Sequence, residues 1–192
     1  MIMSEIIDQN VTFRLIKERI ANTTNPRHLT MLNQLLTHAQ AESVADIDAV
    51  MATLSRNPVY RAWGSPPAMN PEGREAVRIF YDEEVVKGGK FFFEFDLDRI
   101  VIDDFAIVTE GMFHSVYWGR DAQAAGFPAE NPDGFYLLHM RMLIVWPCDD
   151  DGFIVGEESY SAITQPDFLE EIREDQLPAV YRAFHERRLA AA

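Results

Sequence analysis

In the first part of the chain, apolar residues recur every three or four positions among charged ones. This spacing places them on one face of a helix, and it predicts amphipathic helices over residues 5–21, 28–41 and 73–86. A shorter helix is predicted over 45–55. Pro26 fits the first turn of the second helix, because proline lacks the N–H that a first turn leaves unpaired. The first part of the chain should therefore be mostly helical.

In the middle of the chain the period changes to two. Alternating apolar and polar residues predict strands over 90–103, 105–118, 135–146 and 153–163. The second and third of these are longer than usual, so we expect strong curvature or a bulge, with Gly111 as its natural place. Helices followed by a run of antiparallel strands indicate an α+β fold.

Two segments do not fit this order of helices followed by strands. The Pro- and Gly-rich segment 56–73 should be irregular, and its Tyr60 and Trp63 should either close one end of the core or line the mouth of a cavity. The tail from residue 166 reads as amphipathic helix, broken at Pro178 so that the last helix is separate and free to pack on a partner chain.

The composition of the chain argues against several classes of protein. The chain has 192 residues, enough for one domain, and a formal net charge of −14, which argues against binding nucleic acid or an anionic membrane. Its single cysteine, Cys148, excludes an internal disulfide and suits a reducing cytoplasm; beside three aspartates, its thiol pKa should be raised. No apolar stretch is long enough to span a bilayer and none has the pattern of a secretory signal, so we expect a cytoplasmic protein.

Three segments resemble a known family. The helix beginning GREAVRIFYDEEV, the strand ending IVIDDFAIVTEG and the hairpin DDDGFIVGEESY are similar to the SnoaL-like branch of the nuclear-transport-factor-2-like (NTF2-like) superfamily, over about residues 41–163. The resemblance implies one domain over 1–192, a cone of helices closed on a strongly curved antiparallel sheet around an apolar pocket. An N-terminal helical extension (about 1–26) and a C-terminal helical tail (about 166–192) flank it, and a homodimer or higher homo-oligomer is expected.

The chain departs from the family at two places. Asn57 with Pro58, and Ala162, stand where family members often carry a catalytic aspartate. The resemblance is therefore nearer to the scytalone dehydratase and dehydrochlorinase pattern, with histidines on adjacent strands and tyrosines on the helical side. In this chain that pattern implies His114 and His139 on neighbouring strands.

The candidate catalytic residues follow from this. His114 is the preferred base and His139 the second histidine candidate, because histidine titrates near neutral pH. Glu110, on the same strand face, would orient its ring or face solvent. Arg141, Tyr60 and Tyr81 would stabilise an oxyanion or a leaving group.

The sequence does not decide which side chains of the strand predicted over 135–146 face the pocket. Either His139 and Arg141 face the pocket, or Tyr136 and Met140 do and the first pair belongs to a dimer interface. His114 itself could also be a structural histidine.

Several other residues complete the expected site. His28 and His38, on the second predicted helix, are expected to be surface or capping histidines. Candidate substrate-binding residues are large aromatic or sulfur-containing side chains: Tyr117, Tyr136, Trp63, Phe93 and Met112. The chain has no nucleotide-binding, hydrolase or zinc motif, so no cofactor and no metal are expected.

These residues favour a cofactor-independent lyase that acts by acid/base catalysis on a small aromatic molecule. Dehydration fits, and so does retro-aldol cleavage such as formaldehyde loss from an aromatic diol. The alternatives are an isomerase or cyclase of the same fold, or a non-catalytic ligand-binding or dimeric adaptor domain.

Overall fold

A computed structural model describes residues 6–190, so residues 1–5 and 191–192 of the two expected extensions lie outside the described part. The helices are α1 (Gln9–Ala21), α2 (Pro26–Ser43), α3 (Ile47–Ala52), α4 (Arg74–Phe80), α5 (Gly119–Ala124) and α6 (Ala179–Ala190). The strands are β1 (Arg61–Ala62), β2 (Phe93–Ile102), β3 (Ala106–Trp118), β4 (Phe135–Pro147), β5 (Glu158–Ala162) and β6 (Leu169–Ile172). No helix within 6–190 is long and apolar enough to cross a membrane.

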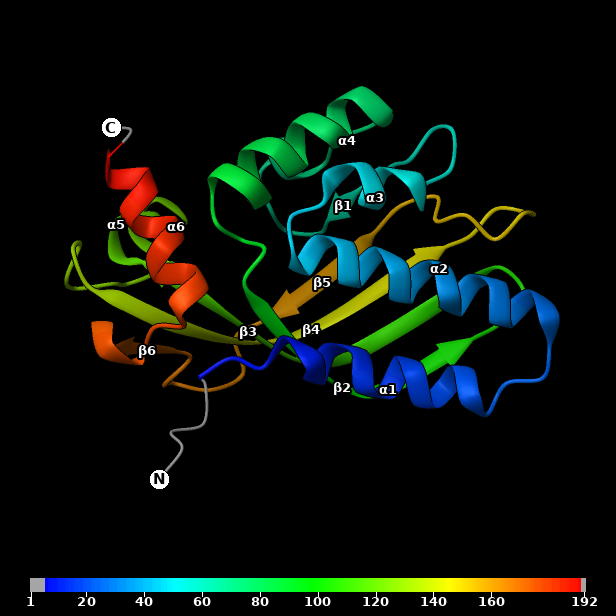
Figure 1. Cartoon of the computed structure of the whole chain (residues 1–192), viewed down its shortest axis with the longest axis horizontal. Coiled ribbons are helices and arrows are strands. Elements are labelled where there is room, and N and C mark those ends of the chain that lie inside the picture. Colours follow the sequence, from blue (N-terminus) through cyan, green and yellow to red (C-terminus); the bar gives the residue numbers. More distant parts are fainter. Residues whose placement is uncertain (1–5, 191–192) are drawn as a thin grey trace.

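The strands form one sheet in the order β1-β5-β4-β3-β2, with β6 added to β4 (Figure 1). Strands β3 and β4 pair over their whole length in one unbroken register. The expected α+β fold is confirmed. The sheet is mixed rather than purely antiparallel, because β1, in the segment expected to be irregular, pairs parallel to β5.

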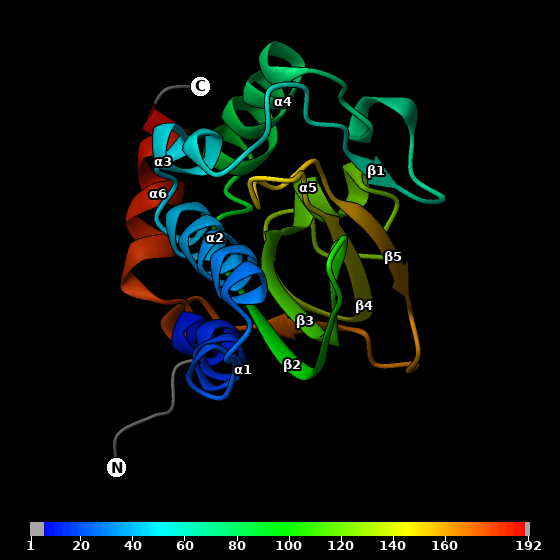
Figure 2. The ribbon, with the colours of Figure 1, turned by 90° about the vertical axis from the view of Figure 1, so that its right-hand side faces the viewer.

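The sheet bends strongly, and in Figure 2 strands β2 to β5 curve around an interior, with α1, α2, α3 and α6 on one side. The register of β2 with β3 shifts between Leu97 and Arg99, opposite Gly111. A Cβ atom on Gly111 would lie 2.1 Å from the backbone oxygen of Asp96, so only glycine fits this close approach. The bulge therefore lies in the strand beside Gly111, and the glycine accommodates it.

Helix α2 supplies much of the core. Asn25 caps it, and Pro26 occupies its first turn as predicted. Its buried face carries Met31, Leu32 and Leu35, each at most 1% exposed. Because helical periodicity continues this face to residues 38 and 42, α2 also carries polar side chains inward.

The helix expected over 73–86 is not uniform. An α-helix (α4) runs into a π-helix over Tyr81–Lys87, which ends at Gly88. A π-helix rotates the following side chains relative to an α-helix, and such segments occur often at functional sites. Here the π-helix begins at Tyr81, which is 1% exposed.

The tail differs from its prediction. Residues Leu169–Ile172 form a strand, β6, that pairs with the first part of β4, where an amphipathic helix was expected. The free edge of β4 offers backbone hydrogen bonds there, and these outweigh a short helical pattern. The last helix, α6, is separate as predicted, but it packs on its own chain, with Phe184 against Phe91.

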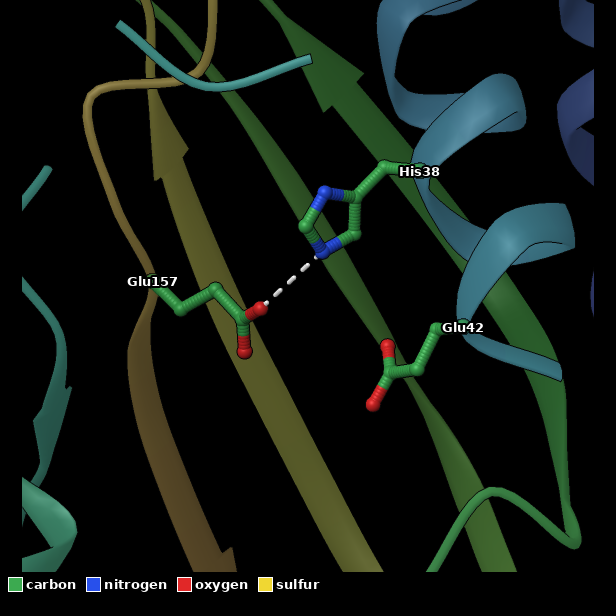
Figure 3. A group of neighbouring side chains, drawn as sticks. All are labelled: His38, Glu42 and Glu157. Carbon is green, nitrogen blue, oxygen red and sulfur yellow. Dashed lines mark ion pairs between the residues drawn. The ribbon is translucent and has the colours of Figure 1, made fainter. Parts of the chain in front are cut away.

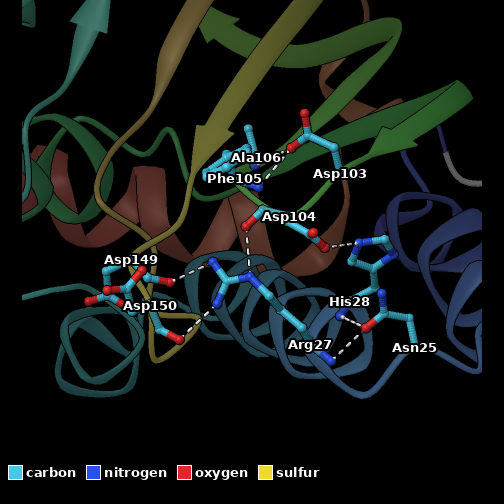
Figure 4. Close-up of polar contacts among 9 residues, drawn as sticks. All are labelled: Asn25, Arg27, His28, Asp103, Asp104, Phe105, Ala106, Asp149 and Asp150. Atoms are coloured by element: carbon cyan, nitrogen blue, oxygen red, sulfur yellow. Dashed lines mark hydrogen bonds and ion pairs between the residues drawn. The ribbon is translucent and has the colours of Figure 1, made fainter.

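Arg27, at the start of α2, joins the helix to two turns of the sheet (Figure 4). Its guanidinium donates to the backbone oxygens of Asp104, Asp149 and Asp150 at 2.7 to 3.0 Å. His28 meets the Asp104 carboxylate at 3.0 Å. These contacts fix one end of α2 relative to the sheet and thereby help to fix the polar residues further along the helix.

Candidate functional site

His38 lies in the interior, with 0% of its surface exposed, so the expectation of a surface or capping histidine is wrong. Its Nδ1 is 2.8 Å from the Thr53 hydroxyl, which itself donates to the backbone oxygen of Val50 at 2.6 Å. Because that hydroxyl proton is already used, Nδ1 must carry the proton that joins His38 to Thr53. A neutral His38 therefore presents the lone pair of Nε2 to the interior.

Three oxygen-bearing side chains converge in front of that nitrogen. The Tyr81 hydroxyl is 3.0 Å from His38 Nε2, and Glu157 Oε1 is 3.3 Å from it. Tyr81 also lies 3.1 Å from Glu157 Oε1 and 2.8 Å from the Tyr60 hydroxyl. The single proton of Tyr81 thus has an imidazole and a carboxylate within reach, and Tyr60 can supply a second proton behind it. We call His38, Tyr60, Tyr81 and Glu157 the interior cluster.

Glu42 lies next to this cluster, one helical turn after His38 (Figure 3). Ligand atoms of His38, Glu42 and Glu157 all lie within 4.8 Å of one another. Burial raises the pKa of Glu42 well above its usual value, and the charge of Glu157 raises it further. In the described part of the chain, neither glutamate forms an ion pair with Lys or Arg.

The two tyrosines of the cluster are held as hydrogen-bond donors. Burial raises the pKa of Tyr60 and of Tyr81 well above the ordinary value, and the charge of Glu157 adds to the effect in both. The ring of Trp146 packs edge-on against His38 with centroids 5.6 Å apart. The cluster is therefore a polar group set within an aromatic core, where hydrogen bonds and charges act strongly.

A cavity of about 810 Å³ lies beside this group. Three short segments join the two: Tyr60, Tyr81 and Glu157 belong to the cluster, while Ala62, Glu84 and Ser159 line the cavity. Residues two apart on an extended chain point to the same side, which relates Tyr60 to Ala62 and Glu157 to Ser159. The interior cluster therefore lies next to segments that line the cavity, while its own four side chains are not part of the cavity wall.

The wall of the cavity is mostly apolar. Its apolar lining includes Met140, Met142 and Phe127, and Tyr117 contributes to it as well. Burial raises the pKa of Tyr117 to about 12. Lys90, which also lines the cavity, is paired with Glu84. The size suits a small organic molecule with an apolar body.

His114 and His139 form a second polar group, on the other face of the sheet. They pair directly across β3 and β4, with their Nδ1 atoms 2.6 Å apart. Met140 lines the cavity, so alternation along β4 turns its neighbours His139 and Arg141 away from it. Burial lowers the pKa of His114, and the charge of His139 lowers it further.

Arg141 and Glu110 belong to this outer group as well. The guanidinium of Arg141 meets Glu110 at 2.6 Å and also pairs with Asp98, while Arg99 meets Glu110 at 3.0 Å. Glu110 therefore pairs with arginines, and the ring nitrogen that His114 contacts belongs to His139. Of the six candidate catalytic residues, the structure brings together Tyr60 with Tyr81 inside, and the other four outside.

The candidate substrate-binding residues are dispersed. Tyr117 lines the cavity. Trp63 is 53% exposed and stacks on Tyr160. Phe93 is buried against Phe113. The remaining two are Tyr136, whose hydroxyl accepts from the backbone N–H of Asn131, and Met112, which is half-buried on the strand face that carries His114. At Cys148, burial raises the thiol pKa to about 11, as expected.

The sequence contains one local signal for the interior group. His38 and Glu42 stand four positions apart, and this spacing places them on one face of a helix. Glu157 precedes Ser159 by two, so both face the interior. What the sequence lacks is any sign that these two segments meet, because that contact depends on how α2 crosses the sheet.

The sequence matches no family model and no curated protein. Solved structures do match. A protein from Shewanella denitrificans, assigned to the SnoaL-like polyketide cyclases, is similar over 84% of this chain and 98% of its own, with 11% identity and a TM-score of 0.54. An LEH-like epoxide hydrolase from Mycobacterium tuberculosis is similar over 69% and 83%, with 19% identity and a TM-score of 0.51.

A third similar structure carries a ligand. It is RV0760c from Mycobacterium tuberculosis in complex with estradiol-17beta-hemisuccinate, similar over 73% of this chain and 97% of its own, with 13% identity and a TM-score of 0.50. At such identities these likenesses show the fold alone. The chain has the NTF2-like fold, which is found among cyclases, epoxide hydrolases and ligand-binding proteins.

Proposed function

We propose that this chain is a lyase that acts by acid/base catalysis on a small aromatic molecule, using the interior cluster and no organic cofactor. The observation that carries the proposal is the Tyr81 hydroxyl, which lies 3.0 Å from His38 Nε2 and 3.1 Å from Glu157 Oε1. The chain segments that hold Tyr81 and Glu157 also line an apolar cavity, through Glu84 and Ser159. A hydroxyl within hydrogen-bond reach of two proton acceptors can relay a proton between them and a substrate.

Each member of the cluster has a role in this proposal. Glu157, which lies 3.3 Å from His38 Nε2, takes a proton from the substrate. Tyr81 and Tyr60 hydrogen-bond the substrate oxygen on which negative charge develops, and a pair of fixed donors in a dry site stabilises such charge strongly. Dehydration and retro-aldol cleavage, including formaldehyde loss from an aromatic diol, both need one base for a proton and one donor for an oxygen.

The cavity supports the substrate class. Its volume of about 810 Å³ and its methionine and phenylalanine side chains suit an aromatic body, with the reacting oxygen directed to the cluster. The similar structure RV0760c holds a steroid ester, and a computationally designed binder of 17-OHP has a similar fold with a TM-score of 0.51. Apolar ligands of this size are thus compatible with the fold.

The rival base is His114, the residue that the sequence favours. We place the chemistry at the interior cluster because Met140 and Met142 line the cavity, whereas His139 and Arg141 leave the strand on the opposite face. In our proposal, the outer pair of histidines contributes to stability and not to turnover.

The test is turnover of a panel of aromatic diols and hydroxy-ketones, with release of formaldehyde or water-loss product as the readout. Tyr81→Phe should lower kcat by about 10²- to 10³-fold, the effect of removing one oxyanion donor. Tyr160→Phe is the matched control, since Tyr160 is 46% exposed. Unchanged turnover in Tyr81→Phe would contradict the proposed site, and no turnover by the wild-type chain would favour a non-catalytic binder.

A further inference from the structure

Glu42 is the member of the interior group that the proposed function leaves unused. It is half-buried, it makes no ion pair with Lys or Arg in the described structure, and the carboxylate of Glu157 lies nearby (Figure 3). Two carboxylates close together in an interior with no cation between them are unfavourable, because each loses hydration and repels the other. A positive ion between them would remove both penalties.

The geometry points to a site for a first-row divalent metal ion, with Zn²⁺ as its representative, bound by His38 Nε2 and by the carboxylates of Glu42 and Glu157. The inference goes beyond the proposed function and does not depend on it, because it concerns only what these three donors bind. Nothing in the sequence motifs indicated a metal, and the site is assembled from two distant segments.

The imidazole is oriented as a metal ligand requires. Its Nδ1–H is fixed by the Thr53 hydroxyl at 2.8 Å, and metal-binding histidines characteristically donate their other N–H to an oxygen in this way. The lone pair of Nε2 consequently faces the Tyr81 hydroxyl at 3.0 Å and the Glu157 carboxylate at 3.3 Å, and an ion bound there would take the place of Tyr81 as the partner of Nε2. The surrounding core holds the ring, since His38 is 0% exposed. The orientation of the His38 ring is set by Thr53 and does not depend on the two glutamates.

The distances between donors are compatible with one ion. Ligands at zinc bond lengths are separated from each other by about 3.0 to 3.5 Å in tetrahedral or octahedral geometry. His38 Nε2 and Glu157 Oε1 are 3.3 Å apart and meet this condition as they stand. All three ligand atoms lie within 4.8 Å of one another, and the flexible side chain of Glu42 can supply the remaining approach.

The donor set also selects the type of ion. One imidazole and two carboxylates suit zinc and its neighbours, whereas Mg²⁺ and Ca²⁺ prefer oxygen ligands alone. Three protein ligands leave at least one position open, beside the Tyr81 hydroxyl. Under the proposed function, a bound ion would use the His38 lone pair, so the loaded protein should be inactive in the acid/base reaction.

The experiment is calorimetric titration of chelator-treated full-length protein with ZnCl₂, in the absence of any substrate, with MgCl₂ as a parallel titration. We expect one Zn²⁺ per chain and no binding of Mg²⁺. Glu42→Gln and Glu157→Gln should each weaken Zn²⁺ binding by at least about 100-fold, the upper end of the loss found when only an outer-shell partner is removed. Co²⁺ should give visible absorption in the wild-type chain and lose it in these variants.

The outer histidines provide the control, because their two imidazoles meet and could themselves bind Zn²⁺. The double variant His114→Gln/His139→Gln should bind Zn²⁺ as the wild type does. Glu42→Gln is the decisive variant, since the Glu42 side chain has no hydrogen bond or ion pair in the described structure and its replacement should not affect folding. Absence of Zn²⁺ binding, or binding that survives in Glu42→Gln and disappears in the histidine double variant, would overturn the inference.

Discussion

Tyr81→Phe removes one hydroxyl from the centre of the interior cluster and should destabilise the fold. The hydroxyl donates one hydrogen bond and accepts another, with Glu157 at 3.1 Å and Tyr60 at 2.8 Å. A bond to a charged group contributes about 1.5 to 3 kcal/mol and a neutral one about 1 kcal/mol. The expected loss in free energy of unfolding is therefore about 2.5 to 4 kcal/mol.

Urea denaturation followed by tryptophan fluorescence measures this loss. With a slope of about 3 kcal/mol per molar urea, the midpoint should fall by about 1 M. Tyr160→Phe changes an exposed tyrosine and should stay within about 0.5 kcal/mol of the wild type. A Tyr81→Phe midpoint that matches the Tyr160→Phe midpoint would refute the reasoning that the Tyr81 hydroxyl joins the cluster.

Three further predictions concern other parts of the fold. Burial and His139 lower the pKa of His114 in the folded state. Its contribution to stability is therefore complete above the unfolded pKa of about 6.5 and is lost as the pH falls toward the folded pKa. The free energy of unfolding should fall by up to about 1.4 kcal/mol per pH unit in this range. His114→Gln should flatten this fall between pH 7.5 and 5.5 in urea midpoints, and parallel profiles would count against it. Gly111→Ala would place a Cβ 2.1 Å from the Asp96 backbone oxygen and should lower the free energy of unfolding by about 1 to 3 kcal/mol, again by urea titration; a neutral effect would mean that β2 and β3 are not so close. Burial raises the thiol pKa of Cys148 to about 11, so iodoacetamide at pH 8 should modify the folded protein about 100-fold more slowly than the urea-unfolded chain, and equal rates would contradict its burial.

The regular elements could be predicted because their signals are local. The helical spacing of Leu29 to Leu36 reflects one buried face, and α2 forms where it predicts a helix. The alternation of Phe91 to Leu97 predicts a strand, and β2 forms there from Phe93 onward. The segment Leu169–Ile172 was predicted as helix because its apolar spacing is ambiguous over so few residues. Its strand conformation depends on the free edge of β4, which no local pattern reports.

The candidate site shows the same limit. Tyr60 and Tyr81 could be named because tyrosines on the helical side are part of the family resemblance. His38 was misjudged because a histidine between Thr37 and Ala39 gives no local sign of burial, although its spacing from Glu42 was readable. That Glu157 completes the group depends on the packing of α2 against the bent sheet, and only the three-dimensional structure supplies it.

The central claim is that turnover takes place at the interior cluster. The most direct test is kcat for Glu157→Gln and for His114→Gln, measured on one active aromatic substrate. Removal of a general base lowers kcat by about 10²- to 10⁴-fold, and we predict this loss for Glu157→Gln, with His114→Gln close to the wild type. The opposite pattern, full activity in Glu157→Gln and loss in His114→Gln, would contradict the account and place the chemistry on the outer face of the sheet.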